Sequence, residues 1–202
     1  MGNQTNENIE KLSNFLNPEI LKENLISLSL YVANFEALKA YIIEQPKSLF
    51  EIGFDENGIL LDEKRYNEKV KSKDENILKA SLFWWIEQGA LEQKDFIDFY
   101  NLRSIRNSIV HEMFNHLFNG INEFTSSFED LLEIKVKLDR WWTINIEIPT
   151  NPDIEDVSKI NLAEVITSSE ILLILFSYTL SNDEEKSKYF YNELMRIQKN
   201  HQ

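Results

Sequence analysis

The sequence predicts an all-α fold, an up-and-down helix bundle with one short irregular or hairpin insertion. Glycine and proline are scarce, with five and four copies in 202 residues, and a sandwich or barrel needs a turn about every ten residues. Apolar residues recur at three- and four-residue steps, which is the period of a helix. With 43% hydrophobic and 12% aromatic residues, a chain of this length can bury its own core as a single domain, residues 1–202.

Composition also excludes several classes of function. The chain has no cysteine, which excludes disulfide frameworks, thiolate zinc sites and cysteine nucleophiles. Its net charge of −13 argues against a nonspecific nucleic-acid coat protein, because acidic surfaces repel phosphates. The charge leaves a small local site open, and it can also simply serve solubility.

The sequence shows no secretory or membrane-spanning signal. The first residues lack a positive segment followed by an apolar one, so no secretory signal is visible. The most apolar stretch, residues 171–176, is far shorter than the roughly 20 residues that a membrane span requires. We therefore expect a cytoplasmic protein with no membrane partner.

The N-terminal part of the chain is predicted to form two helices. The first, residues 7–15, ends before Asn17, which can cap a second helix that accepts Pro18 in its first turn. Over residues 20–44, apolar side chains follow a helical stripe: Ile20, Leu21, Leu25, Leu28, Val32, Phe35, Leu38 and Ile42. Pro46 is expected to stop this helix, because the residue before a proline is pushed out of the α region.

Residues 49–73 are interpreted as an insertion in the bundle. The segment 55–58 supplies turn chemistry, and residues 50–52 and 58–61 on either side of it are rich in apolar residues. These two short segments could pair as a hairpin.

Three helices are predicted next, residues 74–88, 92–119 and 122–142. Gly89 and Gly120 follow the first two of them, at positions where glycine commonly ends a helix. The helical period continues through each of these segments, so we expect short connections between long helices.

The C-terminal part is predicted to begin with an extended piece. Residues 143–148 alternate with period two up to Pro149, which favours a short strand-like segment. Residues 150–161 are expected to form a loop, and the last two helices are expected over residues 162–180 and 183–200.

The helix predicted over residues 92–119 carries the residues best suited to chemistry. A helical projection places a polar side opposite a broad apolar arc made of Phe99, Leu102, Ile105, Ile109, Val110, Met113, Phe114 and Leu117. Arg106 falls in the middle of that arc, where a guanidinium must be paired, reach solvent or line a cleft. Arg103, Asn107 and His111 are spaced four apart along one margin of the arc. The arc is wider than one bundle face needs, which predicts a homodimer.

Arg106 and His111 are separated by four residues in the segment Ile-Arg-Asn-Ser-Ile-Val-His-Glu, residues 105–112. In this segment the chain resembles the HEPN superfamily (higher eukaryotes and prokaryotes nucleotide-binding), whose signature is an arginine, four to six residues and a histidine on a long helix of a four- to five-helix bundle. The resemblance implies a metal-independent endoribonuclease of the toxin or antiphage-defence type, with Arg106 and His111 catalytic. Asn107, which matches a polar residue found there in many members, and Arg103 are candidate substrate-binding residues.

The resemblance also implies partners and a reaction. Family members commonly pair two such motifs across a dimer interface, so a homodimer, an RNA substrate and an antitoxin or other protein partner are expected, with no cofactor or metal. A histidine can move the proton of a ribose 2′-OH, and an arginine can hold the phosphate. The alternative is a catalytically silent helical module for dimerisation or for binding a nucleotide or partner, in which both residues are satisfied, buried polar groups.

Two other groups of residues are less promising as sites. His116 follows His111 by five residues, which places them about 140° apart on a helix, so a metal pair is not expected. The tryptophan pairs at 84–85 and 141–142 could stack on bases, but core packing is the favoured interpretation.

Overall fold

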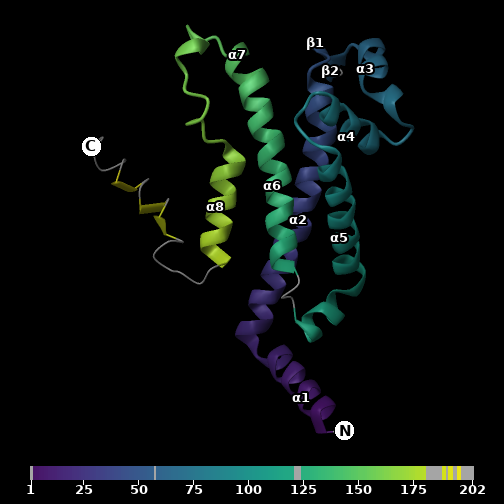
Figure 1. The fold of residues 1–202 in the computed structure, drawn as a ribbon, viewed down its shortest axis with the longest axis vertical. Helices are drawn as coiled ribbons and strands as arrows, with labels where there is room; N and C mark the ends of the chain where they lie inside the picture. The colour runs from purple at the N-terminus through teal and green to yellow at the C-terminus, as the bar shows by residue number, and fades with distance from the viewer. Residues whose placement is uncertain are drawn as a thin grey trace. The chain divides into compact units, whose positions relative to one another are not determined.

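A computed structural model of the chain describes residues 2–56, 58–120 and 124–180, together with residues 188–189, 191–192 and 195–196. It confirms the predicted all-α fold: helices dominate and one small two-stranded sheet accompanies them (Figure 1). The chain packs as two compact units, Met1–Leu138 and Asp139–Gln202, which are described separately below. The assignment of residues 1–202 to one domain stays a prediction.

The first two helices meet at Asn17, as predicted. Helix α1 spans Gly2–Leu16 and therefore starts earlier than the predicted residue 7. Helix α2 spans Pro18–Ser48, and the Asn17 side chain caps it by accepting a hydrogen bond from the Glu19 amide at 3.0 Å. By length and composition α2 could cross a membrane, and its buried residues include Leu28, Phe35 and Leu38.

The prediction that Pro46 stops the second helix is wrong, because α2 continues through it to Ser48. A proline inside a helix leaves the carbonyl four residues earlier without its amide donor. Here that carbonyl belongs to Ile42, and it accepts a hydrogen bond from the Trp85 indole at 3.0 Å. Trp85 lies in α4, Ile77–Glu87, and is fully buried. A tertiary contact therefore replaces the missing backbone bond.

The predicted hairpin is confirmed. Strand β1, Glu51–Asp55, pairs antiparallel with β2, Gly58–Leu61, in a sheet of these two strands. The rest of the insertion is more regular than expected: it forms α3, Glu63–Lys69, and the 3-10 turn η1, Lys71–Lys73. The Asp62 side chain caps α3 by accepting from the Arg65 amide at 3.1 Å. This local cap explains why a helix forms directly after the hairpin.

The next two helices begin and end close to the predicted residues. The Asn76 side chain caps α4, and Gly89 ends it with a φ of 75°, a conformation that glycine adopts without steric cost. Helix α5 spans Gln93–Asn119 and opens with a reciprocal capping box between Glu92 and Asp95. Gly120 ends α5 with a φ of 93°.

The core of the first unit lies where α2, α4 and α5 pack together. Its fully buried side chains include Leu28, Tyr31, Phe35, Leu38, Ile42, Leu82, Trp85, Phe99 and Ile109. The rings of Phe35 and Phe99 stack 5.3 Å apart between α2 and α5. The Tyr31 hydroxyl donates to the Leu102 carbonyl at 3.2 Å, so the buried phenol keeps a partner.

Stability is expected to fall at alkaline pH because of Tyr31. Burial raises the pKa of its phenol, so the fold favours the neutral form. The stabilisation is complete below the unfolded pKa of about 10, and it is lost as the pH rises through the folded pKa. Urea unfolding between pH 7 and 11.5 should show this loss. Tyr31→Phe should reduce it, whereas Tyr191→Phe, at an exposed tyrosine, should leave it unchanged. Equal alkaline losses in both variants would contradict the assignment.

The second unit begins in the last turn of α6, Phe124–Trp142. The predicted extended piece over residues 143–148 is wrong, because the helix continues as a π turn, Thr143–Glu147, and a short α7, Ile148–Thr150. The side-chain Nδ2 of Asn145 donates to the Trp141 carbonyl at 2.8 Å, across the junction of α6 and the π turn. Adding residues to an existing helix costs less free energy than starting a new helix. The helix therefore continues through residues 143–148, although their apolar and polar residues alternate as in a strand.

The predicted loop after residue 150 runs on to residue 167 and contains one 3-10 turn, Val157–Lys159. Arg140 holds this loop: its guanidinium donates to the carbonyls of Val165 and Leu162, both at 2.9 Å. Helix α8, Ser168–Leu180, starts later than predicted but ends where expected. The predicted helix over residues 183–200 lies largely outside the described residues.

Candidate functional site

Helix α5 bends directly after His111. Glu112 has φ −127° and ψ 28°, which are not helical values, and the helix changes direction near its C-terminal end (Figure 1). Ser108 and His116 lie on either side of this kink, and Ser108 Oγ is 2.9 Å from His116 Nε2. Eight residues of straight helix rise about 12 Å, more than these side chains can bridge. The bend therefore brings a hydroxyl and an imidazole together.

Arg106 is held at the contact between α2 and α5. Its Nη2 lies 2.5 Å from Glu36 Oε1 on α2, and its Nη1 donates to Asn107 Oδ1 at 3.1 Å. Its Nε is buried and has no hydrogen-bond partner. From the sequence, the guanidinium of Arg106 was expected to be paired, to reach solvent or to line a cleft. It is paired with Glu36, but its Nε lacks a hydrogen-bond partner.

His111 lies on the solvent side of the same helix and is exposed. No hydrogen bond or ion pair to it occurs among the described residues. The apolar arc around it is only partly covered: Ile109 and Leu117 are buried, whereas Val110 is 43% exposed and Phe114 is 80% exposed. The alternative in which His111 is a satisfied, buried polar group therefore does not describe this residue.

The four predicted site residues are only partly assembled in one copy of the chain. Arg106 and Asn107 are in contact. The Arg103 guanidinium lies instead 5.8 Å from the centre of the Tyr100 ring and is exposed. His111 belongs to the next turn of α5, five residues after Arg106, and five residues turn a helix by about 140° relative to the starting direction. A complete catalytic site would therefore need side chains from another part of the chain or from a second copy.

Sequence reasoning missed the Ser108–His116 pair. The only signal was a separation of eight residues, which in a straight helix excludes contact. The kink at Glu112 could not be read from the sequence, because the segment contains neither proline nor glycine to mark it.

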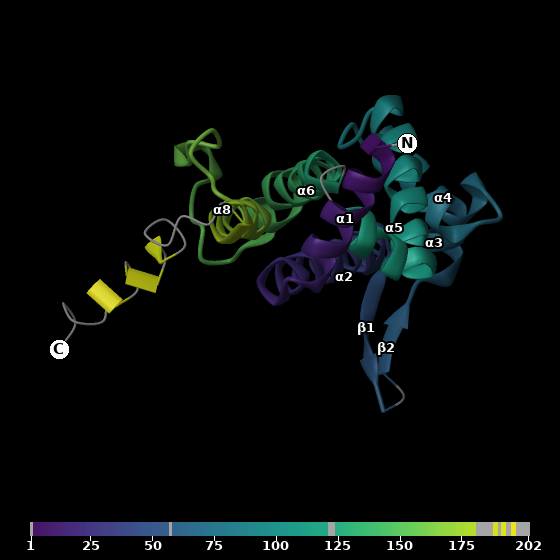
Figure 2. The same cartoon turned by 90° about the horizontal axis from the view of Figure 1, so that it is seen from below.

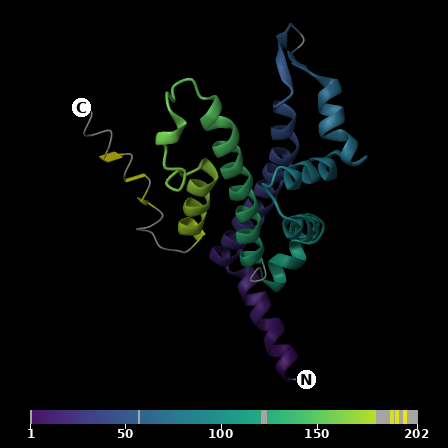
Figure 3. The same ribbon diagram turned by 45° about the horizontal axis from the view of Figure 1, so that its top comes forward.

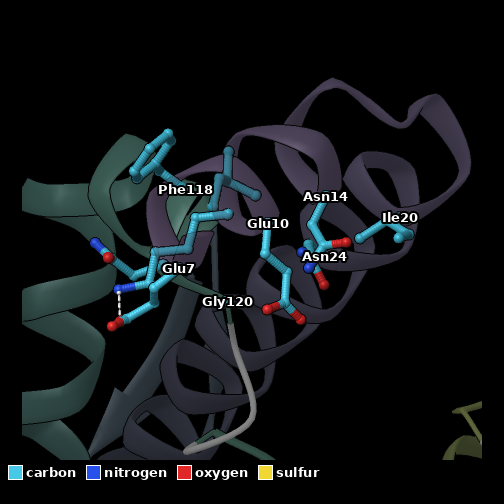
Figure 4. Close-up of a pocket in the computed structure, with 10 residues that line it drawn as sticks. Glu7, Glu10, Asn14, Ile20, Asn24, Phe118 and Gly120 are labelled. Atoms are coloured by element: carbon cyan, nitrogen blue, oxygen red, sulfur yellow. Dashed lines mark ion pairs between the residues drawn. The ribbon is translucent and has the colours of Figure 1, made fainter. Parts of the chain in front are cut away.

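A polar cavity of about 320 Å³ lies between α1, the start of α2 and the end of α5 (Figure 4). Its lining includes Glu7, Glu10, Asn14, Asn24 and Phe118. Glu7 forms an ion pair with Lys11 at 2.8 Å, which lowers the pKa of the Glu7 carboxyl. None of the four predicted site residues lines this cavity.

The described part of the chain contains no group of three or more histidine, aspartate and glutamate side chains that could hold a metal ion.

Comparison of the chain with models of protein families, with curated proteins and with solved structures finds no match. The resemblance to the HEPN superfamily therefore depends on the Arg106–His111 segment and on the helical fold that carries it.

Proposed function

We propose that the chain is a metal-independent endoribonuclease of the toxin or antiphage-defence type, whose site is completed when two copies associate along α5. The observation that carries the proposal is the exposure of His111 between two exposed apolar side chains, Val110 and Phe114, on the helix that also holds Arg106. An imidazole in that position is available to a substrate, and the surface beside it is available to a second copy.

A dimer along this surface would supply what one copy lacks. Val110 and Phe114 lie on the two sides of the kink at Glu112, and both are exposed. A two-fold interface buries the same patch on both copies, so it would bring two His111 side chains near one another. One could then take the proton of the ribose 2′-OH while the other protonates the leaving 5′-oxygen.

Arg106 would serve as the phosphate ligand in this site. A guanidinium binds phosphate through two parallel hydrogen bonds, and it offsets the charge that develops on the oxygens in the transition state. Glu36 and Asn107 orient the side chain in the free protein, and a phosphate would replace the Glu36 carboxylate as its anionic partner. We propose that Asn107 and Arg103 contact the rest of the RNA. We also propose that the protein acts in the cytoplasm.

The test is cleavage of total RNA by the purified protein in excess EDTA, with analysis of the product ends. Attack by the 2′-OH should give 2′,3′-cyclic phosphates, and DNA should stay intact. Sedimentation at micromolar concentration should show a dimer. Phe114→Asp should dissociate that dimer and stop cleavage, whereas Ile97→Asp, at an exposed apolar residue elsewhere on α5, should do neither. Cleavage that disappears in EDTA, or cleavage of DNA, would refute the mechanism.

A second candidate is a silent helical module that dimerises or binds an antitoxin, another protein or a nucleotide. The contact that favours it is the ion pair between Arg106 and Glu36 at 2.5 Å, because a guanidinium already paired with a carboxylate has less charge to offer a phosphate. A protein that dimerises through Phe114 but cleaves no RNA would support this candidate over the nuclease.

A further inference from the structure

The hairpin of β1 and β2 exposes an unusual amount of apolar surface for so short a segment. Phe54 is 86% exposed, Ile52 and Ile59 are each 67% exposed, and Leu60 is 42% exposed. Phe54 lies opposite Ile59 in the register of the two strands, so these two side chains form a cross-strand apolar pair. Large apolar side chains exposed together on one short surface segment commonly mark sites of interaction.

The base of the hairpin is firmly attached, although its tip is exposed. Phe50 is 7% exposed and packs against Tyr66 of α3, with the ring centres 5.7 Å apart. The Asp62 amide donates to the Phe50 carbonyl at 2.8 Å and extends the ladder to the foot of the strands. Figures 2 and 3 show the strands extending from the end of α2 away from α4 and α5. The apolar tip is therefore held out from the first unit.

The strands also offer free backbone edges. The sheet consists of β1 and β2, so one edge of each strand has no neighbouring strand in this sheet. Natural proteins commonly protect such edges with lysine, proline or a bulge. Residues 50–62 contain neither lysine nor proline, and the register shift between Glu51 and Gly53 leaves Gly53, Phe54 and Asp55 in regular pairing with β2. An extended segment from another molecule can add to such an edge.

The charges around the patch indicate the chemistry of its partner. Residues 50–62 contain four acids, Glu51, Asp55, Glu56 and Asp62, and no lysine or arginine. An added strand with alternating apolar and basic side chains would place its apolar side chains beside Phe54 and Ile59. Its basic side chains would lie on the opposite face of the sheet. Asp55 is on that face, because neighbouring residues of a strand point to opposite faces.

The same charges argue against a second copy as the occupant. Antiparallel pairing of β1 with its own copy would bring the end of each strand at Glu51 towards the other strand's end at Asp55, and like charges across a sheet are destabilising. Two hairpins would also bring together six carboxylates, those of Glu51, Asp55 and Glu56 from each copy. The fourth acid, Asp62, caps α3 and has its Oδ2 4.0 Å from Arg65 Nε.

We propose that the β1–β2 hairpin is a docking site for a basic, extended segment of another protein, in which apolar side chains alternate with lysine or arginine. The segment adds to an edge of the sheet and covers Phe54 and Ile59. This site is separate from Arg106 and His111, so it can bring in a protein partner whether or not the chain cleaves RNA.

The test uses the full chain and a fluorescent seven-residue peptide of alternating lysine and valine, with binding followed by anisotropy. Two comparison peptides replace every lysine with glutamate or every valine with glycine. The lysine–valine peptide should bind at least about tenfold more tightly than either, and binding should weaken as salt is added. The double variant Phe54→Ser with Ile59→Ser should lose about tenfold in affinity, and Glu51→Gln with Glu56→Gln should flatten the salt dependence.

Ile97→Ser is the matched control, because it removes an exposed apolar side chain from α5, outside the hairpin, and it should bind the peptide as the wild type does. Circular dichroism should show the same helical spectrum for every variant. Equal binding by the Phe54→Ser/Ile59→Ser variant, equal binding of the lysine–glycine peptide, or no binding of the lysine–valine peptide would overturn the proposal. So would a dimer of the wild type that dissociates in the Phe54→Ser/Ile59→Ser variant, since a second copy would then be the occupant.

Discussion

Replacing His111 by alanine is expected to lower the rate of RNA cleavage by about 10²–10⁴-fold, the usual contribution of a general acid–base group. The melting temperature should stay close to that of the wild type, because His111 is exposed and surface substitutions of this kind rarely change stability by more than about 0.5 kcal/mol. RNA binding should persist, since Arg106 still holds the phosphate. Cleavage rates, RNA binding and thermal unfolding of the same preparations measure all three.

His116→Ala is the matched control on the same helix. It removes an imidazole that contacts Ser108 across the kink, so it can alter the bend of α5, but it keeps His111. Cleavage that survives in His116→Ala and is lost in His111→Ala would support the proposed assignment. The reverse result would make His116, with the Ser108 hydroxyl, the chemically active histidine and would refute the role given to His111.

Replacing Trp85 by alanine is expected to destabilise the first unit by about 3–5 kcal/mol, as for other large-to-small changes in a core. The indole is fully buried, stacks near Tyr41 and meets Trp84 edge-on. It also donates the hydrogen bond that the Ile42 carbonyl cannot receive from Pro46. Urea unfolding monitored by circular dichroism should show a lower midpoint.

A pair of milder variants isolates the hydrogen bond from the packing. Trp85→Phe keeps an aromatic ring but leaves the buried Ile42 carbonyl without a donor, which should cost about 1–3 kcal/mol beyond the smaller ring. In a Pro46→Ala background the alanine amide can donate to that carbonyl, so the same Trp85→Phe change should cost less. A double-mutant cycle measures the difference. Additive effects would contradict the view that Trp85 compensates for the proline.

The sequence alone determined the fold class, most helix limits and the hairpin, because local chemistry decides these features. Asn17 caps α2, Gly89 and Gly120 end α4 and α5, and the turn residues after β1 fold the strand back. Each of these signals acts within a few residues of its own position. The segment with Arg106 and His111 was likewise placed correctly on one long helix.

Only the tertiary structure decided the features that depend on contacts distant in sequence. Pro46 is tolerated because Trp85, which lies on another helix, satisfies the Ile42 carbonyl. The guanidinium of Arg106 is paired because α2 packs beside α5 and brings Glu36 to it. The kink at Glu112 and the exposure of Phe114 likewise follow from which part of α5 the core covers and which part it leaves to solvent. A helical pattern fixes the direction of a side chain around its axis, whereas the packing of the neighbouring helices decides whether that direction is buried, paired or exposed.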